Sequence, residues 1–92
     1  MNRDKRSSWL GNLFHQWFPA TPALPSALLV QARRLYDDGA YQACIQQLTA
    51  ALALPPDPAF VPASAYKWRG LAYRALKDFA AALADLEEVI RR

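Results

Sequence analysis

The sequence predicts an all-α fold in which one helical unit occurs twice. Apolar residues recur at helical spacings of three and four positions along most of the 92-residue chain, and prolines and glycines separate these stretches. The spacing of the stretch after Gly39 also recurs 38 positions later, an interval that we call the repeat period. A fixed period in a helical sequence is typical of repeat arrays, which usually serve as binding surfaces. The matching pairs are Tyr41 and Phe79, Ile45 and Leu83, Leu48 and Leu86, and Leu52 and Ile90.

The length and charge of the chain limit the classes of function. Ninety-two residues predict one small helical domain, which we place at residues 26–92, after an N-terminal helix and a proline-rich linker in residues 1–25. The net charge of +3 is spread along the chain. Nucleic-acid binding requires a basic stripe on one face, so we do not expect a nucleic-acid partner. The single cysteine excludes an internal disulfide and a multi-cysteine metal site.

An amphipathic helix is predicted near the N-terminus. Ser7 or Ser8 can cap a helix that begins at Trp9, and Pro19 ends it. Such a short helix is not stable alone in water, so its apolar face must dock on the repeats, on a partner or on a membrane. The three prolines of residues 19–25 then form a stiff linker. The docking face consists of Trp9, Leu10, Leu13, Phe14, Trp17 and Phe18.

The N-terminal segment also indicates where the protein is located. No apolar run approaches the ~18 residues that span a membrane. A signal peptide would have an evenly apolar core, but Asn12, His15 and Gln16 interrupt this one. We therefore expect a cytoplasmic chain that retains its N-terminus, with association at a membrane surface as an alternative.

Two helices joined by a tight turn are predicted after the linker. Ser26 is the expected N-cap of a helix over residues 27–37. Gly39 ends that helix, because glycine adopts the left-handed conformation without strain. The second helix covers residues 41–54 and turns Cys44 inward. A turn this short makes the two helices antiparallel neighbours.

Residues 63–92 repeat this arrangement after a second proline-rich connection. One helix is expected over residues 63–76 and another over residues 79–91, with Asp78 as the N-cap of the latter. Gly70 lies in the middle of the first of these helices, where glycine is destabilising. We therefore expect a neighbouring helix to approach closely at Gly70.

These two units resemble tetratricopeptide repeats, which are helix–turn–helix units of about 34 residues. The resemblance covers about two thirds of the chain. The departures are Gln31 and Arg69 in place of leucine, Cys44 and Val89 in place of alanine, Lys77 in place of the turn glycine, and a longer period. The residues that carry the resemblance are Leu28, Ala32, Leu35, Gly39, Tyr41, Leu48, Ala51 and Pro56 in the first unit, and Tyr66, Gly70, Tyr73, Phe79, Ala82 and Leu86 in the second.

The resemblance implies that the first helix of each unit lines a concave face, which binds another protein or a peptide. Arg33, Lys67 and Arg74 on that face could hold a carboxylate or an acidic peptide; the alternative is that they are solubilising charges. Some family members clamp a C-terminal carboxylate with residues of three repeats. The third repeat and the clamp's asparagines are missing here, so we do not expect that clamp. The implied face contains Leu29, Arg33, Tyr36, Asp37, Lys67, Leu71 and Arg74.

No group of residues predicts catalysis. His15 is the only histidine and has no oriented partner in the pattern, and Cys44 is expected to be a buried structural thiol. Asp85 and Glu88 are expected to be solvated, with Arg92 or a lysine as an ion-pairing neighbour. We therefore expect neither an enzyme nor a bound metal or other cofactor.

Three functions fit these features. The first is a protein–protein interaction module that serves as an adaptor or as an assembly or scaffolding factor. The second is a peripheral membrane adaptor, in which Arg3, Lys5 and Arg6 flank the aromatic docking helix. The third is a permanent small structural subunit of a complex. Two repeats fall short of the three or so that stabilise an array, so we expect either the N-terminal helix or self-association to cover the ends.

Overall fold

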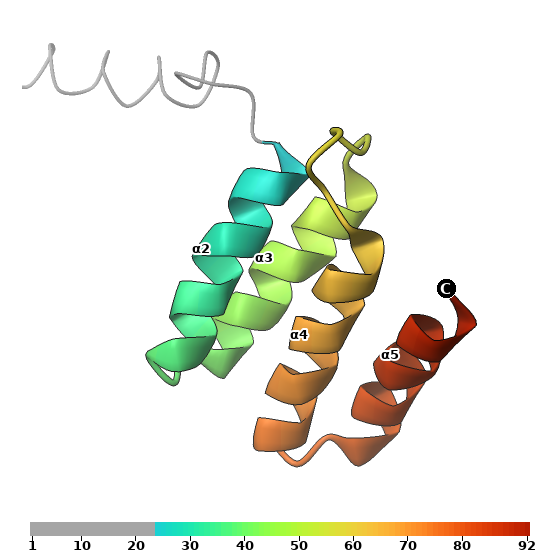
Figure 1. Ribbon diagram of the computed structural model, residues 1–92. Helices are drawn as coiled ribbons and strands as arrows, with labels where there is room; N and C mark the ends of the chain where they lie inside the picture. Colours follow the sequence, from blue (N-terminus) through green and yellow to red (C-terminus); the bar gives the residue numbers. More distant parts are fainter. Residues whose placement is uncertain (1–23) are drawn as a thin grey trace, which may run out of the picture.

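The computed structural model describes residues 24–92, which are all-helical and contain no β-strand (Figure 1). The predicted helix at residues 9–18 lies outside the described residues. Each helix packs against the next, and α2 also touches α4. Successive helices run in opposite directions, as Figure 1 shows. The helices are α2 (Pro25–Asp37), α3 (Tyr41–Ala53), α4 (Pro62–Ala75) and α5 (Phe79–Arg91), all within two residues of the predicted bounds.

The first helix of each unit, α2 in the first and α4 in the second, begins with proline. Pro25 and Pro62 occupy the first helical turn, where the missing N–H leaves no donor unsatisfied. The prediction that Ser26 caps α2 is wrong, because Leu24 occupies the N-cap and Ser26 lies inside the helix. Asp78 caps α5 as predicted, with its side chain accepting a hydrogen bond from the Ala81 N–H at 3.3 Å.

The turns that end α2 and α4 have the same hydrogen bonds, one repeat period apart. The Gly39 N–H donates to the Tyr36 carbonyl and the Ala40 N–H to the Leu35 carbonyl, at 3.0 and 2.8 Å. In the second unit the Lys77 and Asp78 N–H groups make the equivalent bonds to Arg74 and Tyr73, both at 2.9 Å. Gly39 has a φ of +81° and Lys77 a φ of +66°. Both turns are therefore Schellman motifs, but the second places a side chain where glycine is favoured.

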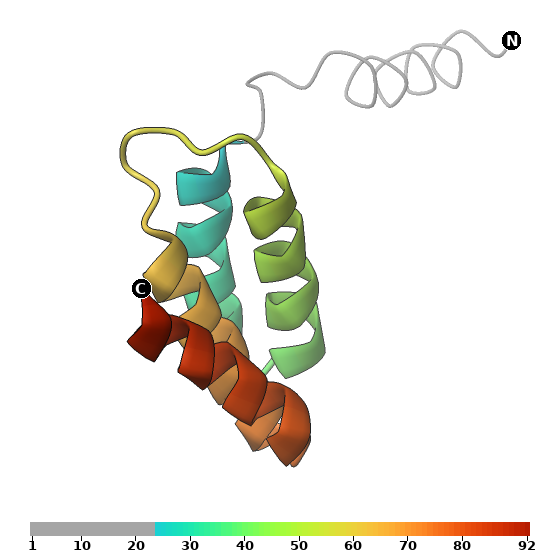
Figure 2. The same cartoon turned by 90° about the vertical axis from the view of Figure 1, so that its right-hand side faces the viewer.

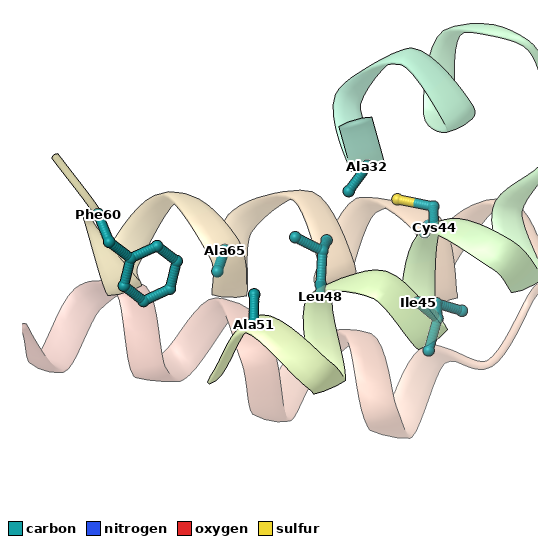
Figure 3. Close-up of a cluster of buried hydrophobic side chains, with 8 residues drawn as sticks. Ala32, Cys44, Ile45, Leu48, Ala51, Phe60 and Ala65 are labelled. Carbon is teal, nitrogen blue, oxygen red and sulfur yellow. The ribbon is translucent and has the colours of Figure 1, made fainter. Parts of the chain in front are cut away.

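The hydrophobic core lies where α3 packs against α2 and α4 (Figure 3). Leu48 at its centre is fully buried, and small residues around it let the helices approach closely. Cys44 is a buried thiol, as predicted, and burial raises its pKa. Phe60 closes one end of the core from the connection between α3 and α4. The buried members of this core are Ala32, Cys44, Ile45, Leu48, Ala51, Phe60, Ala65 and Ala72.

The close approach predicted at Gly70 is confirmed. A Cβ atom placed on Gly70 would lie 3.1 Å from the Leu86 Cγ and 3.2 Å from the Asp85 Cβ, which is tighter than ordinary van der Waals contact. The absence of a side chain at Gly70 thus sets how closely α5 packs on α4. Among the described helices, none is long and apolar enough to cross a membrane.

Candidate partner-binding surface

Three aromatic rings from three different helices form the centre of the candidate surface. Tyr36 of α2 lies 5.3 Å from the ring of Tyr41 in α3 and 5.3 Å from the ring of Trp68 in α4. Both contacts are edge-to-face, with interplanar angles of 66° and 67°. This is a favourable arrangement for aromatic pairs, and it fixes the relative position of α2 and α4.

Two of the predicted binding residues meet at Trp68. The guanidinium carbon of Arg33 lies 5.1 Å from the centroid of the Trp68 ring, and the ammonium nitrogen of Lys67 lies 5.2 Å from it. Both cationic side chains are exposed. Neither forms a salt bridge with a carboxylate of residues 24–92. The resemblance implied that the two cations share a face, and the structure adds the Trp68 ring, which both of them approach.

The other residues implied for this face contribute less directly. Leu29 and Leu71 are half-buried, and Leu29 packs against the core. Arg74 is exposed in the last turn of α4, about 10 Å along the helix from Lys67. Asp37 is exposed at the end of α2. A hollow of about 200 Å³ runs along α2 and is lined by Val30, Arg33, Arg34 and Asp37.

A buried ion pair joins α4 to α5, and sequence reasoning missed it. The Arg69 guanidinium donates to both carboxylate oxygens of Asp85, at 2.7 and 2.8 Å, and a third N–H reaches the Thr49 hydroxyl at 3.2 Å. Asp85 is only 5% exposed. The prediction that Asp85 is solvated and pairs with Arg92 or a lysine is therefore wrong. Hydrogen bonding to Asp85 raises the pKa of the Arg69 guanidinium.

At the equivalent positions of the first unit, two uncharged side chains form a hydrogen bond in place of the Arg69–Asp85 ion pair. The Gln47 amide of α3 donates to the Gln31 side-chain oxygen of α2 at 3.0 Å. Gln31 precedes Arg69, and Gln47 precedes Asp85, by one repeat period. In both units the two side chains are 16 positions apart. The repeat period was therefore the sequence signal from which the contact between Arg69 and Asp85 could have been predicted.

Asp57 connects the loop after α3 to the start of α2. Its carboxylate accepts hydrogen bonds from the Ser26 N–H at 3.0 Å and from the Ser26 hydroxyl at 2.6 Å. These bonds lower the pKa of Asp57, chiefly through the Ser26 hydroxyl. Asp57 thus satisfies a free N–H in the first turn of α2, which is the role that the sequence assigned to the Ser26 side chain.

Glu88 forms the surface ion pairs at the end of α5. Its carboxylate lies 2.9 Å from Arg91 and 3.4 Å from Arg92, which confirms the expected neighbour. Within residues 24–92, no three histidine, cysteine or carboxylate side chains lie close enough together to hold a metal ion.

The sequence and the structure were also compared with known proteins. The chain matches no protein-family model, and no curated protein or solved structure is significantly similar to it.

Proposed function

We propose that the chain is a protein–protein interaction module of two tetratricopeptide-like repeats. It acts as an adaptor or as an assembly or scaffolding factor, and it binds an acidic segment of another protein. The binding surface consists of Arg33, Tyr36, Lys67 and Trp68. The observation that carries this proposal is the pair of exposed cations beside the half-buried Trp68 ring.

The repeat assignment is supported by how regularly the two units correspond. Both units share the hydrogen bonds of their turns, and both place a polar pair at equivalent positions of facing helices. The second helices, α3 and α5, begin one repeat period apart and also end one repeat period apart. Repeats of this kind stack into one continuous surface, which suits an extended or helical peptide.

The chemistry of the surface favours a carboxylate-bearing partner. Arg33 and Lys67 come from different helices, but each lies within about 5 Å of the same ring centroid. The ring restricts the motion of both cations before a ligand arrives, so a carboxylate that binds them loses less side-chain entropy. An apolar side chain next to that carboxylate would contact the exposed part of Trp68 and Tyr36.

Charge reversal in the full chain tests this proposal. The probe is a fluorescently labelled peptide of alternating glutamate and leucine, and the control peptide replaces each glutamate with glutamine. Arg33→Glu and Lys67→Glu should each weaken binding of the acidic peptide by about tenfold or more, because each loses an attraction and adds a repulsion. Arg91→Glu, an exposed arginine at the end of α5, is the matched control and should bind as the wild type does. Equal binding of both peptides, or full binding by both variants, would rule out this surface.

The membrane adaptor remains an alternative. It rests on the basic and aromatic residues before the linker, which lie outside the described residues. The permanent-subunit alternative draws support from the apolar side chains exposed on α5.

A further inference from the structure

The outer face of α5 is apolar and exposed. Phe79, Leu83 and Ile90 have exposed fractions of 63%, 59% and 85%, and their spacing places them on one side of the helix. Among the described helices, α5 packs only against α4. Figure 2 shows α5 on the outside of the helical array. We call these three residues the open face.

The first unit shows what this face looks like when a helix covers it. Tyr41, Ile45 and Leu52 of α3 stand one repeat period before the members of the open face. Ile45 is 5% exposed, and the other two are half-buried. Besides its partner α2, α3 has a second neighbour in α4, whereas α5 packs only on α4 among the described helices. Tyr41 is also covered by the Tyr36 ring of α2.

The residues of α4 that face α3 define the kind of helix that fits. Ala65 and Ala72 are fully buried and stand seven positions apart, so the two backbones can approach closely. Between them, Trp68 packs against the same core, with its ring against Tyr36 of α2. Arg69, on the same side, donates to Thr49 of α3. The covering helix thus has two small residues that bracket a large aromatic residue and a basic residue.

The position equivalent to Thr49 carries a charge on α5. Glu87 stands one repeat period after Thr49, is exposed, and makes no salt bridge with the described residues. Arg69 of α4 reaches Thr49 of α3. A basic side chain that a docked helix held in the same way against α5 would meet the Glu87 carboxylate. The open face therefore favours a basic residue more strongly than the equivalent face of α3 does.

The other helices of this chain do not have the required pattern on a free face. On α2, Arg34 stands where α4 has the buried Ala72, so a second copy cannot stack α2 on α5 as closely. In the predicted N-terminal docking helix, the small residue Gly11 is followed seven positions later by the large residue Phe18. The second small residue of the pattern is therefore missing there.

We propose that the open face of α5 docks a helix of another protein with this pattern. The helix presents small residues at its first and eighth positions, a large aromatic residue at the fourth and an arginine or lysine at the fifth. This surface is separate from the one in the proposed function and does not depend on it.

A peptide derived from α4 provides the probe. It spans residues 62–75 with Tyr66→Gln, beside Arg92, and Gly70→Gln, at the contact with Leu86 of α5, and it keeps Ala65, Trp68, Arg69 and Ala72. Binding to the full-length protein is followed by the backbone amide signals of α5 in NMR spectra. We expect saturable shifts at the open face. Leu83→Lys should weaken binding by about tenfold or more. Val30→Lys, at a similarly exposed position on α2, should leave binding unchanged.

Charge reversal tests the role of Glu87 with a variant that should fold normally. Glu87→Lys should weaken binding of this peptide and strengthen binding of the same peptide carrying Arg69→Glu. The absence of binding, or shifts confined to α2 and the concave face, would overturn the proposal. A wild-type dimer that Leu83→Lys dissociates would assign the face to a second copy instead. If the peptide bound only after Trp9→Ala and Trp17→Ala, the open face would be assigned to the chain's own N-terminal segment.

Discussion

Arg69 of α4 and Asp85 of α5 form a two-pronged ion pair inside the helical array, with N–O distances of 2.7 and 2.8 Å. The Arg69 side chain is only 18% exposed and also reaches Thr49 of α3. One side chain therefore connects three helices across both units. At the equivalent position of the first unit, Gln31 and Gln47 connect only α2 and α3.

Removal of Asp85 should strongly destabilise the fold. Asp85→Ala leaves the Arg69 charge in a largely buried site without its partner, which should lower the free energy of unfolding by about 3 kcal/mol. The double variant with Arg69→Gln and Asp85→Gln recreates the neutral pair of the first unit and should recover part of this loss. Urea denaturation followed by circular dichroism measures both. A double variant less stable than Asp85→Ala would contradict the equivalence of the two pairs.

The left-handed backbone at Lys77 is a source of strain. Lys77→Gly should raise the free energy of unfolding by about 1 kcal/mol, because glycine adopts this φ without a steric penalty. Gly39→Lys is the matched change in the first turn and should lower stability by a similar amount. A Cβ at Gly39 meets open space, so only the backbone conformation is tested there. Thermal unfolding compares the two variants. A Lys77→Gly protein with a lower Tm would exclude strain at this turn.

A methyl group at Gly70 should destabilise the packing of α5. Gly70→Ala gains up to about 1 kcal/mol in helix propensity, but its Cβ would lie within 3.2 Å of Leu86 and Asp85. We expect overpacking to prevail and to reduce stability by about 1–2 kcal/mol. A double-mutant cycle with Leu86→Ala should show a favourable coupling, since the shorter side chain makes room for the methyl group. Independent effects of the two changes would mean that α5 shifts freely on α4.

The ionised Asp57 should make stability depend on pH. Its folded-state pKa is lower than the ordinary value of 3.8, so its contribution is present above that pH and is lost as the pH falls through the folded-state pKa. Asp57→Asn should therefore be less stable than the wild type at pH 7, and the difference should shrink as the pH falls below 3.8. Ser26→Ala should reduce this pH dependence. A stability difference that stays constant between pH 7 and pH 3 would show that the Asp57 charge does not matter.

The sequence predicted the helices because their signals are local. Gly39, Gly70 and Asp78 each act within one turn or one helix contact, and their roles are confirmed. Asp85 was missed because charged residues are seldom buried unless paired, and its partner lies 16 positions away on another helix. Ser26 was misassigned for a similar reason, since the carboxylate that satisfies the start of α2 comes from a distant loop.

The candidate surface was only partly predictable. The resemblance placed Arg33 and Lys67 on one face, but it did not include Trp68 of α4, whose ring centroid lies 5.1 Å from Arg33 and 5.2 Å from Lys67. That contact depends on how α4 packs against α2, and the spacing of residues within each helix contains no information about it.

The indole N–H signals of the three tryptophans test the central claim most directly. In an NMR titration of the full chain with the glutamate–leucine peptide, the Trp68 signal should shift with the same saturation curve as the side-chain signals of Arg33. Trp9 and Trp17 should not shift with that curve. A shift of Trp9 and Trp17 alone, with Trp68 unmoved, would contradict the account and would assign partner binding to the N-terminal segment.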